Sequence, residues 1–133
     1  MSVKHVSQVP EEPVAAGTGT TRQVLIGPEQ GPHFAMRRFV MQPGGGIPAH
    51  SNTVEHEQYV LRGRARVGIG DQVVTVKQGD VVYISAGTPH WYQVEGDEPF
   101  EFLCVVPNLP DHMEMAPTKA SEGASAPRDP SRR

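Results

Sequence analysis

The stretch that decides the fold is residues 46–63, GIPAHSNTVEHEQYVLRG, together with its echo at residues 79–90, GDVVYISAGTPH. Both combine short runs of apolar and polar residues with glycines and prolines that end the runs, a pattern typical of short strands joined by turns. His50, His56 and His90 lie within or beside these runs. A chain that folds back on itself here would bring the three imidazoles together. Desolvating three imidazoles costs free energy, and a bound transition metal is the simplest reason for such a cluster.

Outward from this stretch the same pattern continues in both directions. No window shows a convincing apolar repeat of 3.6 residues, whereas short β-rich runs recur between turn residues. This spacing predicts an all-β fold, an antiparallel sandwich or a small barrel, in a single domain. The predicted strands are residues 22–26, 34–42, 56–62, 65–70, 72–77, 81–84, 88–94 and 100–106.

The two ends of the chain differ from its middle in composition. Residues 1–21 read as an irregular arm, and residues 22–107 as the folded domain. Residues 108–133 form a tail rich in Pro and Ser, which we expect to be disordered from about residue 116, because it offers too little apolar surface to offset the entropy of ordering.

Composition and charge exclude several classes of function. The 133 residues suffice for one domain, and the formal net charge of −3, without any run of Lys or Arg, argues against nucleic-acid binding. No apolar stretch approaches a transmembrane span, and the polar N-terminus does not resemble a signal peptide. Cys104 is the single cysteine and cannot form an internal disulfide. We therefore expect a cytoplasmic protein without a membrane or nucleic-acid partner.

Strand alternation predicts which side chains share the interior with the histidines. If His56 points inward, Gln58 does too, because residues two apart on a strand share a face. The same rule groups His90 with Tyr92. Arg37 and Arg38 are adjacent, so one faces each way; an inward arginine would suggest an anionic substrate, but the sequence does not say which one it is. The residues expected to line the pocket are Gln58, Tyr92, Phe102 and Cys104, with a purely structural role as the alternative for Gln58 and Tyr92 and a small buried hydrophobe as the alternative for Cys104.

The two stretches resemble the two motifs of the cupin superfamily, and the resemblance covers about residues 22–107. His50 matches the first histidine of the first motif, and His90 the histidine of the second. His56 stands where the family usually has its glutamate, seven residues before Gly63. The resemblance implies a double-stranded β-helix, that is, a jelly-roll or cupin barrel.

The histidine at position 56 is similar to that of a subgroup of small cupins whose metal, often manganese, is held by four histidines. This chain departs from the subgroup because Asn52 occupies the position of the second histidine. The resemblance thus implies one divalent transition metal held by His50, His56 and His90. Manganese is favoured, with iron, nickel or zinc as alternatives, and Asn52 is expected to be a weak or absent ligand. Glu55, in the turn, is the alternative source of a carboxylate.

The resemblance also implies a function. We expect a metal-dependent oxygenase of the dioxygenase type, acting on a small organic substrate. The alternatives are a lyase, isomerase or cyclase that uses the metal as a Lewis acid, and a non-catalytic sensor of a small molecule or a metal. Small cupins commonly pair, so we expect a homodimer in which outward-facing Trp91 and the edge before Gly27 bury themselves against a partner subunit.

Overall fold

The computed structural model describes residues 1–116, which form ten strands and one short 3-10 turn. No helix among these residues is long and apolar enough to cross a membrane. The expected disorder concerns residues 117–133, which lie outside the described part of the chain. The elements are η1 (Val6–Gln8), β1 (Glu12–Pro13), β2 (Thr18–Ile26), β3 (Phe34–Asn52), β4 (His56–Arg62), β5 (Arg64–Ile69), β6 (Gln72–Lys77), β7 (Val81–Ile84), β8 (His90–Glu95), β9 (Phe100–Pro107) and β10 (Met113–Met115).

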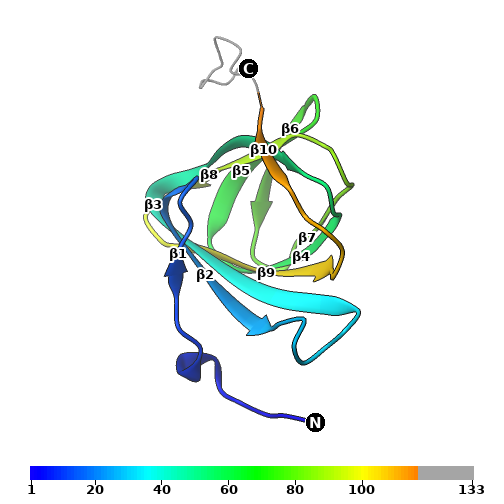
Figure 1. Ribbon diagram of the computed structural model, residues 1–133. Coiled ribbons are helices and arrows are strands. Elements are labelled where there is room, and N and C mark those ends of the chain that lie inside the picture. The colour runs from blue at the N-terminus through cyan, green and yellow to red at the C-terminus, as the bar shows by residue number, and fades with distance from the viewer. Residues whose placement is uncertain (117–133) are drawn as a thin grey trace.

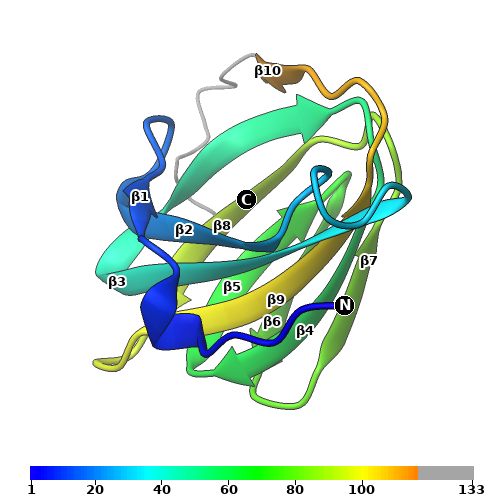
Figure 2. The same ribbon diagram turned by 60° about the horizontal axis from the view of Figure 1, so that its bottom comes forward.

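All strand pairings are antiparallel, and the sheet follows the order β6-β5-β8-β3-β9-β4-β7. The sheet curls into a barrel, as Figure 1 shows, which confirms the predicted all-β jelly roll. The long strand β3 is the centre of the topology. Its first half pairs with β9 and β2, and its second half pairs with β8 and β10. In Figure 2, β2 lies alongside β3, and the short strand β1 pairs with β2.

The prediction that residues 43–46 end a strand was wrong, because β3 continues through them. Glycine makes this possible by allowing both unusual backbone angles and close approach of another strand. Gly44 adopts a φ of 81°. A Cβ atom on Gly46 would lie 2.1 Å from the carbonyl oxygen of Tyr92. The glycines therefore mark the place where β3 bends against β8, and the strand carries on to the first histidine.

Other element bounds also differ from those predicted. Strand β2 begins at Thr18 rather than at residue 22, so the supposed arm contributes to the sheet together with β1. Strand β8 begins at His90 rather than at residue 88. Strand β10 was not predicted, and it pairs Met115 with His50 in β3.

The predicted alternation is found on the strands that matter for the site. Strand β4 buries residues 56, 58 and 60, and β9 buries residues 100, 102, 104 and 106. Phe102 occupies the centre of an aromatic cluster. Its ring centroid lies 5.1 Å from that of Phe39, 5.4 Å from Tyr92 and 5.4 Å from Phe100. This apolar layer supports the polar residues that share the interior with it.

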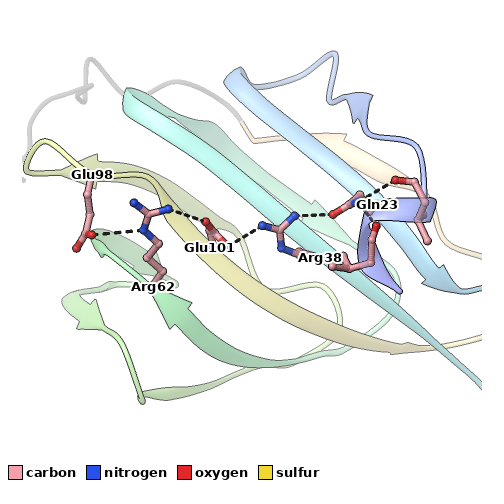
Figure 3. Close-up of polar contacts among 7 residues, drawn as sticks. Gln23, Arg38, Arg62, Glu98 and Glu101 are labelled. Atoms are coloured by element: carbon pink, nitrogen blue, oxygen red, sulfur yellow. Dashed lines mark hydrogen bonds and ion pairs between the residues drawn. The ribbon is translucent and has the colours of Figure 1, made fainter. Parts of the chain in front are cut away.

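A chain of polar contacts ties the outer face of the barrel to the N-terminal segment (Figure 3). Glu101 receives hydrogen bonds from Arg38 at 2.7 Å and from Arg62 at 3.3 Å. Arg38 also donates to Gln23 at 2.6 Å, and the amide nitrogen of Gln23 donates to the carbonyls of Val6 and Val9. Arg38 is therefore the outward-facing member of the adjacent pair of arginines.

Candidate metal centre

His50 and His90 face each other across two paired strands. They are register partners in β3 and β8, and their ring centroids lie 4.2 Å apart. The Nδ1 atom of His50 lies 2.9 Å from the carbonyl oxygen of Pro48, and that of His90 lies 2.9 Å from the carbonyl oxygen of Thr88. A carbonyl only accepts, so Nδ1 carries the proton in both rings and Nε2 keeps a free lone pair. This is the usual arrangement of a metal-ligating histidine.

His56 reaches the same region from β4. Its ring centroid lies 5.5 Å from that of His90. Its Nε2 is 3.2 Å from Oδ1 of Asn52, and its Nδ1 is 3.3 Å from the sulfur of Cys104. Either ring nitrogen can carry the proton here, because a thiol both donates and accepts and an amide can turn to present either group. The contacts with Asn52 and Cys104 are therefore compatible with either tautomer of His56.

The three imidazoles are neutral at pH 7. Burial lowers the pKa of His56 to about 3, helped by the positive charge of Arg37 and by the other two rings. Burial likewise lowers the pKa of His90 to about 4. Burial also lowers the pKa of His50, and the Pro48 carbonyl and Asp111 act in the opposite direction. Neutral rings present lone pairs, which a metal ion requires of its ligands.

A second row of side chains lies beside the histidines on the inner face. Arg37 of β3 and Gln58 of β4 are both register partners of Cys104 of β9. The sulfur of Cys104 lies 3.5 Å from Nη2 of Arg37 and 3.8 Å from Nε2 of Gln58. Gln58 also donates a 2.7 Å hydrogen bond to the hydroxyl of Tyr92. Burial raises the pKa of the Cys104 thiol, so the thiol keeps its proton at neutral pH.

The structure brings together most of the residues predicted for the site. Asn52 is buried beside His56, whereas Glu55 is exposed and its carboxyl is hydrogen-bonded to that of Glu57. This placement gives no support to Glu55 as the alternative ligand. Phe102 packs in the aromatic cluster. The residues predicted to line the pocket, Gln58, Tyr92, Phe102 and Cys104, are all buried on the inner face.

Two features of the site were missed or left open in the sequence analysis. The sequence left open which arginine points inward, and the structure gives Arg37 that orientation. Asp111 acts on the charge state of His50, although it is far from it in the chain. No motif includes Asp111, and only the pairing of β10 with β3 could have indicated that the segment before β10 approaches the histidines.

The donor set fits a divalent metal, although the site is not preformed. No group of three or more His, Cys, Asp or Glu side chains within residues 1–116 is arranged so that it could hold a metal ion without adjustment. In this arrangement Nε2 of His56 is hydrogen-bonded to Oδ1 of Asn52 at 3.2 Å. Nε2 of His50 and of His90 is left available by the carbonyl contacts of Nδ1, and binding of one ion by all three imidazoles would require His56 to release Asn52. A hollow on the described surface is lined by other residues: Met1, Ser2, Ile26, Gln30 and Gly31.

The expected dimer contacts remain a prediction. Trp91 lies against its own chain, since a Cβ atom on Gly68 would meet its indole at 2.0 Å. The guanidinium of Arg66 lies 5.8 Å from the centre of the Trp91 ring. The indole is thus covered in part without a partner subunit.

Residues 37–106 match the family model of the cupin domain. The curled antiparallel barrel and the histidines on its inner face agree with that match. The chain therefore belongs to the cupin superfamily.

Comparison with individual proteins gives further similarities. The chain is 30% identical over 122 residues to 1-methylthio-D-xylulose 5-phosphate methylsulfurylase of Rhodospirillum rubrum, covering 87% of this chain and 78% of that protein. The crystal structure of the polyketide cyclase RemF from Streptomyces resistomycificus is similar with a TM-score of 0.76 and 30% identity, covering 84% of this chain and 83% of that one. A predicted oxalate decarboxylase from Thermotoga maritima has a TM-score of 0.72 at 23% identity, covering 81% of this chain and all (100%) of that one, and shows the shared fold alone.

Proposed function

We propose that this cupin is an enzyme that binds one divalent transition metal through Nε2 of His50, His56 and His90 and acts on a small organic substrate without net oxidation. The observation that carries the proposal is the pair of Nδ1–carbonyl hydrogen bonds at His50 and His90, which fix two buried rings with their lone pairs available. A hydrogen-bonded structural histidine does not need this tautomer in two facing rings.

When bound, the metal would supply Lewis acidity that polarises a substrate oxygen, which suits a cyclase, isomerase, lyase or group-transfer reaction. Three neutral imidazoles leave the charge of the ion undiminished, whereas a carboxylate ligand would reduce it. The residues of this chain have separate tasks. His50 and His90 are oriented by backbone carbonyls, and His56 would give up its contact with Asn52 to hold the ion. Gln58 and Tyr92 hold each other and offer polar atoms beside the cluster.

The relatives favour a reaction without net oxidation over the oxygenase reaction expected from the sequence. The methylsulfurylase and the polyketide cyclase are each 30% identical to this chain over most of their length, and neither is named as an oxygenase. Which metal is bound depends on supply as well as affinity, because manganese, iron, nickel and zinc all accept imidazole; manganese remains our first choice.

The first experiment measures metal stoichiometry by elemental analysis of protein purified without chelator. We expect about one transition metal per chain in the wild type and loss of the metal in His90→Ala. His33→Ala is the matched control, because His33 is exposed and belongs to neither motif. Full metal occupancy in His90→Ala would refute the ligand assignment.

The second experiment separates the classes of reaction. The loaded enzyme is incubated with small keto acids and sugar phosphates in D2O, and exchange of the hydrogens next to the carbonyl is followed by NMR while an electrode records dissolved oxygen. Exchange without oxygen consumption supports Lewis-acid chemistry. Consumption of oxygen that depends on the metal would reject this class in favour of an oxygenase.

A further inference from the structure

Arg37 is a cation on the inner face of the barrel. Its Nη2 lies 3.5 Å from the sulfur of Cys104, and its guanidinium carbon lies 5.1 Å from the centre of the Phe39 ring. Its charge also lowers the pKa of His56. The neighbouring Arg38 has the opposite environment, since it forms an ion pair with Glu101 on the outer face. The alternation of β3 thus puts one arginine beside the histidines and the other outside.

Arg37 has no acidic partner among residues 1–116. No carboxylate of the described chain lies within ion-pair distance of its guanidinium, and its Nε is buried without a hydrogen-bond partner. Arg22 also has an unpartnered Nε, but its guanidinium forms an ion pair with Glu12 at the surface. The buried polar and charged residues of the described part of the chain include no Asp or Glu: they are Thr20, Gln23, His50, Asn52, His56, Gln58 and His90.

A partly buried cation without a counter-charge is costly, and the usual solution is an anion that the guanidinium holds through two parallel hydrogen bonds. The contacts of Arg37 with a neutral sulfur and the face of an aromatic ring do not supply a negative charge. A divalent metal on three neutral imidazoles would add further positive charge to the same region. An anionic ligand would compensate both.

We infer that Arg37 binds an oxyanion group of the substrate, and that the substrate of this protein is therefore a small organic acid, either a carboxylate or a phosphate monoester. The guanidinium would hold the oxyanion while another oxygen of the substrate faces the histidines. This inference rests on the proposed function, because the bound anion is a substrate only if the protein is an enzyme. The binding of the anion to Arg37 can nevertheless be tested without metal.

The test is isothermal titration of metal-free protein with oxalate, with inorganic phosphate and with glycerol as an uncharged probe. We expect at least one of the two anions to bind with a dissociation constant in the millimolar range or tighter, and glycerol not to bind. Arg37→Gln should weaken the binding of that anion by roughly tenfold to a hundredfold, since a charge-assisted bidentate contact is lost. Arg37→Lys should recover only part of this, because lysine cannot form the planar fork. Arg22→Gln, which removes the same charge from an exposed ion pair, should bind as the wild type does.

The two anions identify the charged group, as tighter oxalate binding indicates a carboxylate and tighter phosphate binding a phosphate monoester. An NMR titration of the wild type keeps the test independent of variant folding: the Nε–H resonance of Arg37 should shift on adding the anion and stay in place on adding glycerol. Equal affinity in Arg37→Gln and wild type, no binding of either anion, or an unmoved Arg37 resonance would overturn the inference.

Metal analysis of the variants distinguishes failure of the anion site at Arg37 from failure of the proposed function. Arg37→Gln should keep its metal, whereas His90→Ala should lose it. If His90→Ala also kept its metal, the metal assignment would fail while the anion site was still judged by Arg37→Gln.

Discussion

Acidification should destabilise the metal-free protein because its buried histidines resist protonation. The folded-state pKa is about 3 for His56 and about 4 for His90, against 6.5 for an exposed histidine. Below pH 6.5 the unfolded chain therefore takes up protons that the folded chain refuses. Stability from these two groups is intact above pH 6.5 and is lost progressively as the pH falls toward 4 for His90 and toward 3 for His56.

The size of the effect follows from the width of that window. Each pH unit between the unfolded and folded pKa costs about 1.4 kcal/mol per histidine. The full slope is reached only below pH 6.5, where the unfolded histidine is mostly protonated, so from pH 6.5 to pH 5 His56 and His90 together should lower the free energy of unfolding by about 3 kcal/mol; His50 shifts in the same direction. Folded domains are stable by only about 5–15 kcal/mol, so a loss of this size is a substantial part of the whole.

The assay is urea unfolding of chelator-treated protein at a series of pH values from 7 to 5. The titration of Glu57 would obscure the effect of the histidines. Its hydrogen bond with Glu55 raises its pKa to about 7, so its contribution to stability increases as the pH falls. The measurements are therefore made in a Glu57→Gln background, with and without His56→Gln and His90→Gln. We expect a steep loss of stability in the background and a much flatter profile when both histidines are replaced. A change of less than about 1 kcal/mol between pH 7 and 5 in the background would show that the rings are not desolvated as described.

Three further predictions concern single substitutions, measured by urea unfolding or by metal titration. Glu101→Gln should lower the free energy of unfolding by about 1–3 kcal/mol, because the carboxylate accepts from two arginines and is largely buried; an unchanged midpoint would contradict this. Gly46→Ala should cost about 3 kcal/mol or more, because its Cβ would lie 2.1 Å from the Tyr92 carbonyl, whereas Gly44→Ala, with nothing within 4 Å, should show only the smaller penalty of a positive φ. Asn52→His should tighten metal binding by about tenfold or more, since it adds an imidazole next to His56; an unaltered affinity would mean that position 52 does not face the ion.

The fold predictions that the structure confirms are those based on the local alternation of apolar and polar residues. Alternation of apolar and polar residues is a property of the strand itself, so the inner faces of β4, β8 and β9 followed from the sequence alone. The glycines at 44–46 could not be interpreted in the same way, because glycine serves both a turn and the close approach of another backbone. Only the pairing of β8 with β3 at Gly46 shows that the glycine allows another backbone to approach closely.

The site was predictable where a motif fixed the inward face, and not elsewhere. His56 and His90 fixed the direction of Gln58 and Tyr92, which lie two residues further along their strands. For Arg37 and Arg38 no residue of known direction lies close by on the same regular strand, since the bend at the glycines separates them from His50. The inward arginine therefore needed the register of β3 with β9.

The hydrogen bond between Asn52 and His56 bears on the affinity of the proposed site for a metal ion. Nε2 of His56 can bond to one partner at a time, and in the described geometry that partner is the amide of Asn52. If the proposed metal binds through Nε2, it must break a buried hydrogen bond whose net contribution is about 1 kcal/mol, which would lower the affinity by roughly fivefold. A histidine at position 52 would instead contribute a ligand to the ion. In the proposed metal site, asparagine rather than histidine at position 52 would therefore weaken binding twice, by offering one donor fewer and by competing for Nε2 of His56, while its amide keeps that imidazole hydrogen-bonded in the interior.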